Sequence, residues 1–403
     1  MKRLLVVFIV SVGFITCTDN KRENKPSISH EVKMITSPAS DSSSVPYLFT
    51  SKDETVYMSW VEKKGKESSL RFSILSNGQW SAPSLIASGN DWFVNWADYP
   101  VIAADGNKNL VAHFLEKSDT AKFTYDIKLV TSTDNGSTWS NASTLNDDEK
   151  KAEHGFVTII PYKDGFFSCW LDGRKTAMEE DMSQHEGHHG EMTVRAAMLD
   201  KKGKKINEWE LDGRVCDCCQ TTAAITENGP VVVYRDRSDD EIRDMSITRL
   251  ENGQWSKPIS IYSDNWNINA CPVNGPRADA INNNLAIAWF SMPDKKAEVK
   301  IIFSKDGGAT FGKPIKIDEG NPIGRVDVVM LDTTTAIVSW MEGASIKAVK
   351  VHADGTKEAS VMVASSSDKR SAGFPQMTRS GNKLFFAWTD DKEKSIKVSS
   401  LTF

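Results

Sequence analysis

Seven short apolar segments recur along the chain, and each ends in an aromatic residue followed by polar positions. They read VYMSWVE (56–62), LVAHFLE (110–116), FFSCWLD (166–172), VVVYRDR (231–237), LAIAWFS (285–291), AIVSWME (336–342) and LFFAWTD (384–390). Successive aromatic residues are separated by 54, 56, 64, 55, 51 and 48 positions. Strand-like segments precede and follow each of them, without a helical period between. The pattern therefore predicts an all-β chain built from repeats of about 50 residues.

A repeat of this length is typical of a β-propeller in which every repeat forms one four-stranded blade. Seven repeats can be counted, which favours seven blades, and six blades plus one irregular hairpin is the alternative. The last repeat supplies only three strands before the chain ends. We therefore expect HEVKMIT (30–36) to be its fourth strand, which would join both ends of the chain in one sheet and leave no open edge.

The first residues resemble an export signal. Lys2 and Arg3 precede an apolar run at 4–15, which is too short to span a bilayer as a helix. Cys17 follows directly, as in the signals of bacterial lipoproteins, and this resemblance implies cleavage after residue 16 and a lipid on Cys17. Ordinary secretion is the alternative. We expect 17–29 to be a flexible tether, 30–403 to be a single propeller domain, and the protein to be held in a bacterial cell envelope, periplasmic or surface-exposed, by its lipid alone.

Composition narrows the possible partners. The chain carries 49 Lys and Arg against 54 Asp and Glu, a net charge of −5, and 39% hydrophobic residues. It can bury a core, but it lacks the basic excess of a general nucleic-acid binder. We expect a monomer that binds a small ligand.

Two segments share a sharper motif, S-x-D-x-G-x-T-aromatic, which resembles the Asp-box of sialidases and other BNR-repeat propellers. In such a box the Asp accepts hydrogen bonds within a tight hairpin, the Gly supplies an unusual backbone angle and the aromatic ring packs under the turn. The box lies between the third and fourth strands of a blade, so it indicates fold rather than function. Its residues here are Ser132, Asp134, Gly136 and Trp139, and again Ser304, Asp306, Gly308 and Phe311.

In a propeller, the loop before the innermost strand of a blade and the loop after its second strand lie on the same face. In this chain these loops contain arginines, carboxylates, aromatic residues and thiols, so this face is the expected ligand site. A guanidinium can hold a carboxylate through two hydrogen bonds, and the sialidase resemblance implies three such arginines. The candidates are Arg174, Arg237 and Arg277, with Arg235 and Arg325 behind them. The alternative is that they only balance neighbouring carboxylates.

The same resemblance implies a carboxylic acid as proton donor and a tyrosine nucleophile activated by a glutamate. Asp172, Asp236 and Glu241 are the candidate acids, and Trp92 and Trp96 could stack on a sugar ring. Phe374 stands where the tyrosine is expected, so the sequence identifies no nucleophile. It therefore favours a glycan-directed hydrolase, lyase or binder over retained sialidase chemistry.

Cysteines and histidines support a different hypothesis, a metal-binding propeller. Three thiols share one loop and a fourth lies on the next, which is compatible with a disulfide between the loops or with four thiolates around one metal. Imidazole and thioether groups at 178–192 suit copper or zinc, although an acidic surface loop is the alternative there. The candidate ligands are Cys216, Cys218, Cys219, Cys271, His154, His185, His188 and His189. A third hypothesis is a scaffold that binds partner proteins.

Overall fold

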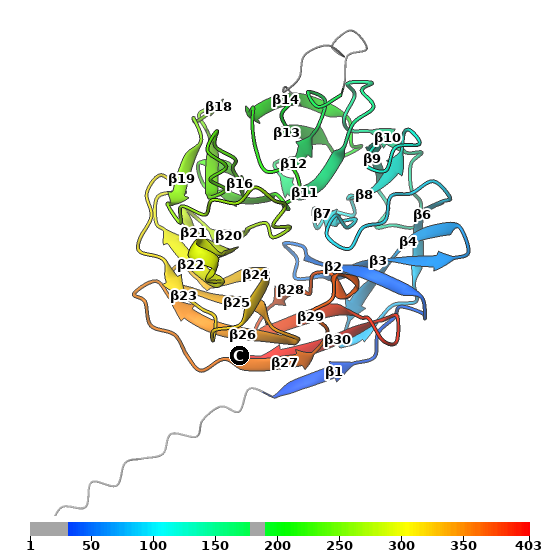
Figure 1. The fold of residues 1–403 in the computed structure, drawn as a ribbon. Helices are drawn as coiled ribbons and strands as arrows, with labels where there is room; N and C mark the ends of the chain where they lie inside the picture. The colour runs from blue at the N-terminus through cyan, green and yellow to red at the C-terminus, as the bar shows by residue number, and fades with distance from the viewer. Residues whose placement is uncertain (1–30, 178–189) are drawn as a thin grey trace, which may run out of the picture.

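The computed structural model describes residues 31–177 and 190–403. Within these ranges the strands form seven sheets arranged as a ring (Figure 1). The prediction of an all-β propeller with seven blades is confirmed. Cys17 and the predicted signal lie outside the described residues, so the lipid anchor stays a prediction. No helix in the described part is long and apolar enough to cross a membrane.

The first four blades follow one another along the chain. Blade 1 comprises β2 (Ser43–Thr50), β3 (Val56–Lys64), β4 (Glu67–Ser76), β5 (Gln79–Trp80) and β6 (Ser84–Gly89). Blade 2 comprises β7 (Ile102–Ala104), β8 (Leu110–Lys117), β9 (Tyr125–Ser132) and β10 (Ser143–Thr144). Blade 3 comprises β11 (His154–Tyr162), β12 (Gly165–Asp172), β13 (Thr193–Asp200) and β14 (Lys205–Asp212). Blade 4 comprises β15 (Thr222–Thr226), β16 (Gly229–Arg235), β17 (Met245–Glu251), β18 (Gln254–Trp255) and β19 (Ile259–Tyr262).

The other three blades complete the ring. Blade 5 comprises β20 (Arg277–Ile281), β21 (Asn284–Ser291), β22 (Glu298–Ser304) and β23 (Ile315–Lys316), with the short helix η1 (Pro293–Lys295). Blade 6 comprises β24 (Pro322–Asp332), β25 (Thr335–Glu342), β26 (Ser345–His352) and β27 (Val361–Ser365). Blade 7 comprises η2 (Arg370–Ala372), β28 (Gln376–Ser380), β29 (Lys383–Asp390), β30 (Ser395–Thr402) and the N-terminal β1 (Val32–Ile35).

The two ends of the chain meet in blade 7, as predicted. β1 pairs antiparallel with β30, with Val32 opposite Leu401 and Ile35 opposite Val398. In Figure 1 the blue strand β1 lies beside the red strands of the C-terminus. This pairing covers the edge that β30 would otherwise expose.

The recurrent apolar segments are the second strands of the blades. Neighbouring blades cover both of their faces, and this is why they read as almost unbroken apolar runs. The tryptophans that end them, such as Trp60 and Trp170, have no exposed surface. Each buried indole N–H needs an acceptor, and a carboxylate two positions further on supplies it in three blades. The pairs are Trp60 with Glu62 at 2.9 Å, Trp170 with Asp172 at 2.8 Å and Trp340 with Glu342 at 2.7 Å.

Both Asp-boxes form the turn between the third and fourth strands of their blades. In the first box the hydroxyl of Ser132 donates to Asp134 at 2.7 Å and accepts from the amide of Gly136 at 2.8 Å. Trp139 packs edge-on against Phe72 of blade 1. The second box repeats the contacts among Ser304, Asp306 and Gly308, and Phe311 packs against the core.

Candidate functional site

A narrow hollow lies at the centre of the ring, where the innermost strands and the loops before them meet. We call the loop before an innermost strand the leading loop of its blade. The wall is formed by Tyr47 of β2, Asp98 and Tyr99 of the leading loop of blade 2, Gln220 of that of blade 4, and Arg277 of β20. Residues of β11 complete it. Five blades therefore contribute to one small site.

Arg277 is the cation of this hollow. Its guanidinium contacts the hydroxyl of Tyr99 and lies 3.5 Å from the amide oxygen of Gln376. The carboxylate of Asp327 approaches it only to 4.0 Å. The close partners of Arg277 are thus neutral, and its charge remains available to an anion. Of the three arginines predicted to grip a ligand, only this one lies in the hollow.

Beside Arg277, two carboxyl groups share one tyrosine. The hydroxyl of Tyr125 donates to Glu153 at 2.7 Å and lies 3.4 Å from Asp98. Burial raises the pKa of Asp98 to about 8 and the pKa of Glu153 to about 7. Asp98 is therefore largely protonated at neutral pH. Tyr125 has no exposed surface and is therefore shielded from a ligand, whereas Glu153 is partly exposed.

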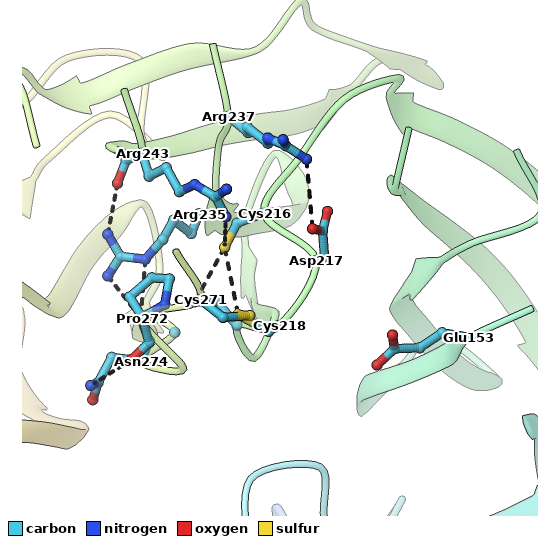
Figure 2. Close-up of a disulfide and its surroundings, with 12 residues drawn as sticks. Glu153, Cys216, Asp217, Cys218, Arg235, Arg237, Arg243, Cys271, Pro272 and Asn274 are labelled. Carbon is cyan, nitrogen blue, oxygen red and sulfur yellow. Dashed lines mark hydrogen bonds and ion pairs between the residues drawn. A yellow bond between two sulfur atoms is a disulfide. The ribbon is translucent and has the colours of Figure 1, made fainter. Parts of the chain in front are cut away.

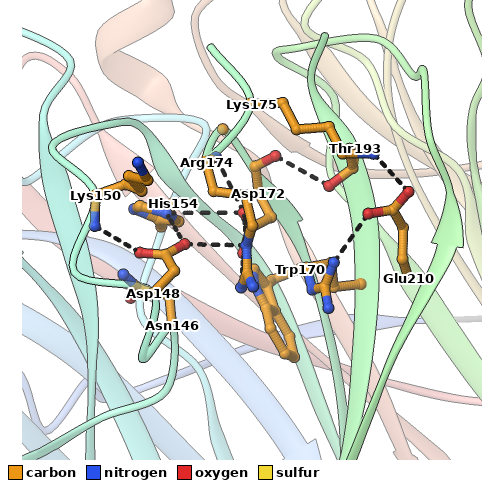
Figure 3. A network of polar contacts seen from close by, with 12 residues as sticks. Asn146, Asp148, Lys150, His154, Trp170, Asp172, Arg174, Lys175, Thr193 and Glu210 are labelled. Carbon is orange, nitrogen blue, oxygen red and sulfur yellow. Dashed lines mark hydrogen bonds and ion pairs between the residues drawn. The ribbon is translucent and has the colours of Figure 1, made fainter. Parts of the chain in front are cut away.

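Arg174 and Asp172 belong to a separate ionic network on blade 3 (Figure 3). Arg174 donates to Asp172 at 2.7 Å and pairs with Asp148 at 3.0 Å and Glu208 at 3.2 Å. Burial opposes ionisation of Asp172, but the hydrogen bond from Arg174 and the charges of His154 and Arg174 outweigh it and lower its pKa. Asp172 is thus held as a carboxylate, which does not fit the predicted role of proton donor, and Arg174 balances charge as in the alternative.

His154 is enclosed in the same network. Its Nε2 lies 2.9 Å from Asp148 and its Nδ1 lies 3.2 Å from the carbonyl of Tyr125. Burial opposes its protonation, but the hydrogen bond to Asp148 and the charges of Asp172 and Asp148 raise its pKa overall. Both ring nitrogens are therefore occupied, and His154 does not join the thiols as a metal ligand.

The predicted residues of blade 4 are also paired. Arg237 holds Glu241 through three contacts of 2.7 to 3.1 Å and lies 3.6 Å from Asp217. The hydrogen bond from Arg237 lowers the pKa of Glu241 to about 2, so Glu241 is not an acid donor. Asp236 accepts a hydrogen bond from Ser246 at 2.9 Å, and burial raises its pKa. Asp236 is the one sequence-predicted acid that the structure leaves more readily protonated.

Arg235 and Arg325 are buried and hydrogen-bonded to the main chain. Arg235 is 1% exposed and donates to the main-chain carbonyls of Asn274, Arg243 and Phe290. Arg325 is also buried and, within the described residues, donates to the main-chain carbonyls of Gly373, Asp368 and Lys369. Neither guanidinium faces the hollow, so the prediction that they support ligand binding finds no geometric basis.

The two tryptophans differ. Trp92 is buried and stacks on Phe114, with ring centroids 4.2 Å apart, so it fills the interior and offers no platform to a sugar. Trp96 is partly buried between Phe374 and the guanidinium of Arg325. Phe374, which occupies the place of the expected nucleophile, is therefore part of this stack.

The thiols of the two adjacent leading loops lie together (Figure 2). Cys218 and Cys271 form a disulfide, which is one of the two arrangements of these thiols that the sequence left open. Cys216 and Cys219 are free and buried. Arg243 donates to the Cys216 sulfur at 3.2 Å. The hydrogen bond with Cys219 and the charges of Arg235 and Arg243 lower the pKa of Cys216 to about 6 despite its burial. His185, His188 and His189 lie outside the described residues.

Comparison with known proteins identifies the family of this chain. Residues 64–386 match the family described as the BNR repeat-like domain. The chain belongs to this family. No curated protein matches it in sequence.

Solved structures resemble this BNR repeat-like protein in fold alone. The polysaccharide lyase Uly1 is 9% identical with a TM-score of 0.55, covering 88% of this chain and 89% of its own. NanB sialidase from Streptococcus pneumoniae is 13% identical with a TM-score of 0.46, covering 92% of this chain and 70% of its own. The propeller domain of the Trilobed protease from Pyrococcus furiosus is 12% identical with a TM-score of 0.46, covering 88% and 95%.

Sequence reasoning on this family member missed Asp98, Tyr125 and Glu153. Asp98 and Glu153 lie in leading loops that the sequence had already assigned to the functional face. An isolated carboxylate within an apolar loop was the available signal for Asp98. Nothing local indicated that Tyr125, on a third strand, would bond to Glu153.

Proposed function

We propose that the protein binds an acidic carbohydrate in the central hollow and that Arg277 receives its carboxylate. The single observation that carries this proposal is the set of close partners of Arg277, which are a hydroxyl and an amide rather than a carboxylate. A guanidinium whose close partners are neutral binds an anionic ligand more tightly than a neutral one, because a hydrogen bond between charged groups contributes more binding free energy than a hydrogen bond between neutral groups. The phenolic groups of Tyr47 and Tyr99 add polar and aromatic surface for a sugar ring.

Asp98 gives this site a carboxyl group that can donate a proton. It lines the hollow, and because its pKa is about 8 it is mostly protonated at neutral pH. A protonated carboxyl group near a glycosidic oxygen can donate its proton to the leaving alcohol, which is the role of the acid in glycoside cleavage. We therefore propose a glycoside-cleaving enzyme in which Arg277 positions the ligand and Asp98 is the proton donor. The lipid-anchored, monomeric envelope protein remains our proposal for its cellular form.

Calorimetric titration tests the binding step. The ligands are oligosaccharides that contain sialic, glucuronic or galacturonic acid, with their neutral counterparts as controls. Arg277→Gln should weaken binding of the acidic ligand tenfold to about a hundredfold, the effect of losing a charged hydrogen bond of about 1.5–3 kcal/mol. The matched control Arg249→Gln removes a guanidinium that pairs with Glu251 at the other end of a blade, and it should bind normally. Equal affinity for neutral and acidic sugars, or normal binding by Arg277→Gln, would contradict the proposal.

A further inference from the structure

The four sulfur atoms of the leading loops of blades 4 and 5 form a compact cluster apart from the proposed carbohydrate site. Cys216 Sγ lies 3.6 Å from Cys219 Sγ and 3.9 Å from Cys218 Sγ. The three sulfurs of this loop all lie within 4.8 Å of one another. Cys271 reaches the cluster from the neighbouring loop through its bond to Cys218.

These separations match the geometry of thiolate ligands around one ion. Zinc–sulfur bonds of about 2.3 Å at tetrahedral angles place the sulfur atoms about 3.8 Å apart. The two distances from Cys216 lie on either side of this value. Cys216 is thus already at the correct spacing from Cys218 and Cys219, which lie within 4.8 Å of each other, and Cys271 completes the site once its sulfur separates from that of Cys218.

The charges around the cluster favour an anion there. Arg235 is almost completely buried, and its hydrogen bonds in the described part of the chain go to main-chain carbonyls, which are neutral. A buried cation requires a nearby negative charge. Figure 2 shows Arg235 and Arg243 beside Cys216, and Arg243 donates to its sulfur at 3.2 Å. Arg243 also pairs with Glu241 at 2.8 Å, whereas the hydrogen bonds of Arg235 leave its charge unbalanced. Four thiolates around a divalent ion carry a net charge of −2 and would supply the missing negative charge.

We propose that reduction of the Cys218–Cys271 disulfide converts this cluster into a tetrathiolate site for one soft cation, Zn²⁺ or Cu⁺, that links blades 4 and 5. A dithiol supplies the two electrons and two protons. The bond between the two sulfurs breaks, both cysteines become thiols, and the dithiol is oxidised to a cyclic disulfide. Binding of the cation then expels the thiol protons. In this way either a disulfide or a metal ion can connect the two loops.

Metal loading of the oxidised and reduced full-length protein tests the proposal. Co²⁺ serves as the optical probe for the zinc site, because its thiolate-to-metal absorption is not produced by the histidines at 178–192. We expect one equivalent of thiolate-bound Co²⁺ after treatment with a dithiol and removal of the excess, displaced by Zn²⁺, and none in the oxidised protein. Cu⁺ is tested in parallel by the number of equivalents that survive gel filtration.

Variants assign the ligands. Cys216→Ser and Cys219→Ser should abolish the absorption, whereas the control Cys169→Ser should retain it, since this buried thiol donates to Thr221 in another part of the core. If a variant fails to fold, alkylation of the reduced wild-type protein followed by mass spectrometry gives the answer. Zn²⁺ or Cu⁺ should protect all four cluster cysteines together. Equal binding by oxidised protein, or no binding and no protection after reduction, would overturn the proposal, and neither result depends on carbohydrate binding.

Discussion

Asp98 accepts a hydrogen bond of 2.7 Å from the main-chain amide of Phe156, and this bond ties the leading loop of blade 2 to the innermost strand of blade 3. The same device joins later blades. Asp279 accepts from the amide of Met330 at 2.7 Å, and Asp327 accepts from that of Met377 at 2.8 Å. Burial raises the pKa of all three carboxyl groups, to about 8 for Asp98 and about 6 for Asp279. The junctions around the centre of the ring are therefore sensitive to pH.

The pKa of Asp98 predicts a stability that decreases as the pH rises. Its value is about 8 in the folded protein against an ordinary 3.8, so between these values the folded protein holds a proton that the unfolded chain releases. Asp98→Asn cannot ionise and still accepts the bond from Phe156. We expect it to remove on the order of 3 kcal/mol of the loss in unfolding free energy between pH 5 and 8, as measured by urea denaturation.

Asp279→Asn is the matched control for that measurement. Its pKa of about 6 confines its effect to the interval between pH 3.8 and about 6. An unchanged slope in Asp98→Asn would mean that Asp98 is ionised in the folded protein. It would then also lose its proposed role as proton donor. If Asp98 is the proton donor, Asp98→Asn should still bind the acidic oligosaccharide but should not cleave its glycosidic bonds, so no new sugar ends should appear.

The network around Asp172 should stabilise the fold rather than serve catalysis. Asp172→Asn leaves Arg174 and His154 facing one less negative charge in a buried setting, and breaking such a pair lowers stability by about 3–5 kcal/mol. Glu342→Gln is the control, because Glu342 accepts the equivalent indole bond from Trp340 and the main-chain amides of Glu319 and Asn321, but is partly exposed and pairs with no arginine of the described residues. The new amide nitrogen would face one of these N–H donors, so the loss should be about 1–2 kcal/mol and stay below that of Asp172→Asn. Comparable losses in both variants would contradict this interpretation.

The same network predicts two pH limits. The raised pKa of His154 contributes stability that is complete below its ordinary value of 6.5 and is lost as the pH rises through the folded value. The lowered pKa values of Asp172 and Asp148 contribute stability present above their ordinary value of 3.8 and lost as the pH falls through the folded values. His154→Gln should remove the part of the high-pH loss that His154 contributes, leave the part due to Asp98, and keep the low-pH dependence. NMR titration of the imidazole checks the direction directly, and a pKa below 6.5 would exclude this account.

The Asp-box glycine can be tested against an ordinary turn glycine. Gly136 and Gly78 have similar backbone angles, with φ of +82° and +77°, so alanine at either position lowers stability by about 1–2 kcal/mol through backbone strain. A side-chain carbon at Gly136 would lie 2.3 Å from Phe72 Cζ, whereas nothing lies within 4 Å of one at Gly78. Gly136→Ala should therefore lose about 1–3 kcal/mol more in urea denaturation. Equal losses would show that Phe72 moves aside freely.

The repeat pattern could predict the blades because burial on both faces leaves a mark in consecutive residues. The carboxylate of Asp172 looked functional in sequence, yet it accepts an indole hydrogen bond from Trp170, as Glu62 does from Trp60. Pairing across the ring leaves no such mark. Tyr125 of blade 2 bonds to Glu153 of the leading loop of blade 3, and Arg277 of blade 5 meets Tyr99 of the leading loop of blade 2. Which arginine keeps a free charge depends on these distant partners, and the sequence therefore proposed Arg174 and Arg277 on equal terms.

The closing strand offers a last test of what holds the ring together. In β1, Ile35 packs against the core of blades 1 and 7, whereas Met34 points outward with 60% of its surface exposed. Ile35→Ala should lower the unfolding free energy by about 1 kcal/mol and lower the midpoint of thermal unfolding accordingly. Met34→Ala should leave this midpoint unchanged. Deleting residues up to 36 should have a larger effect, because it bares the edge of β30 for pairing with another molecule. We expect the truncated protein to associate in a concentration-dependent way in sedimentation experiments. A truncated protein that stays monomeric and equally stable would mean that packing between the blades closes the propeller without β1.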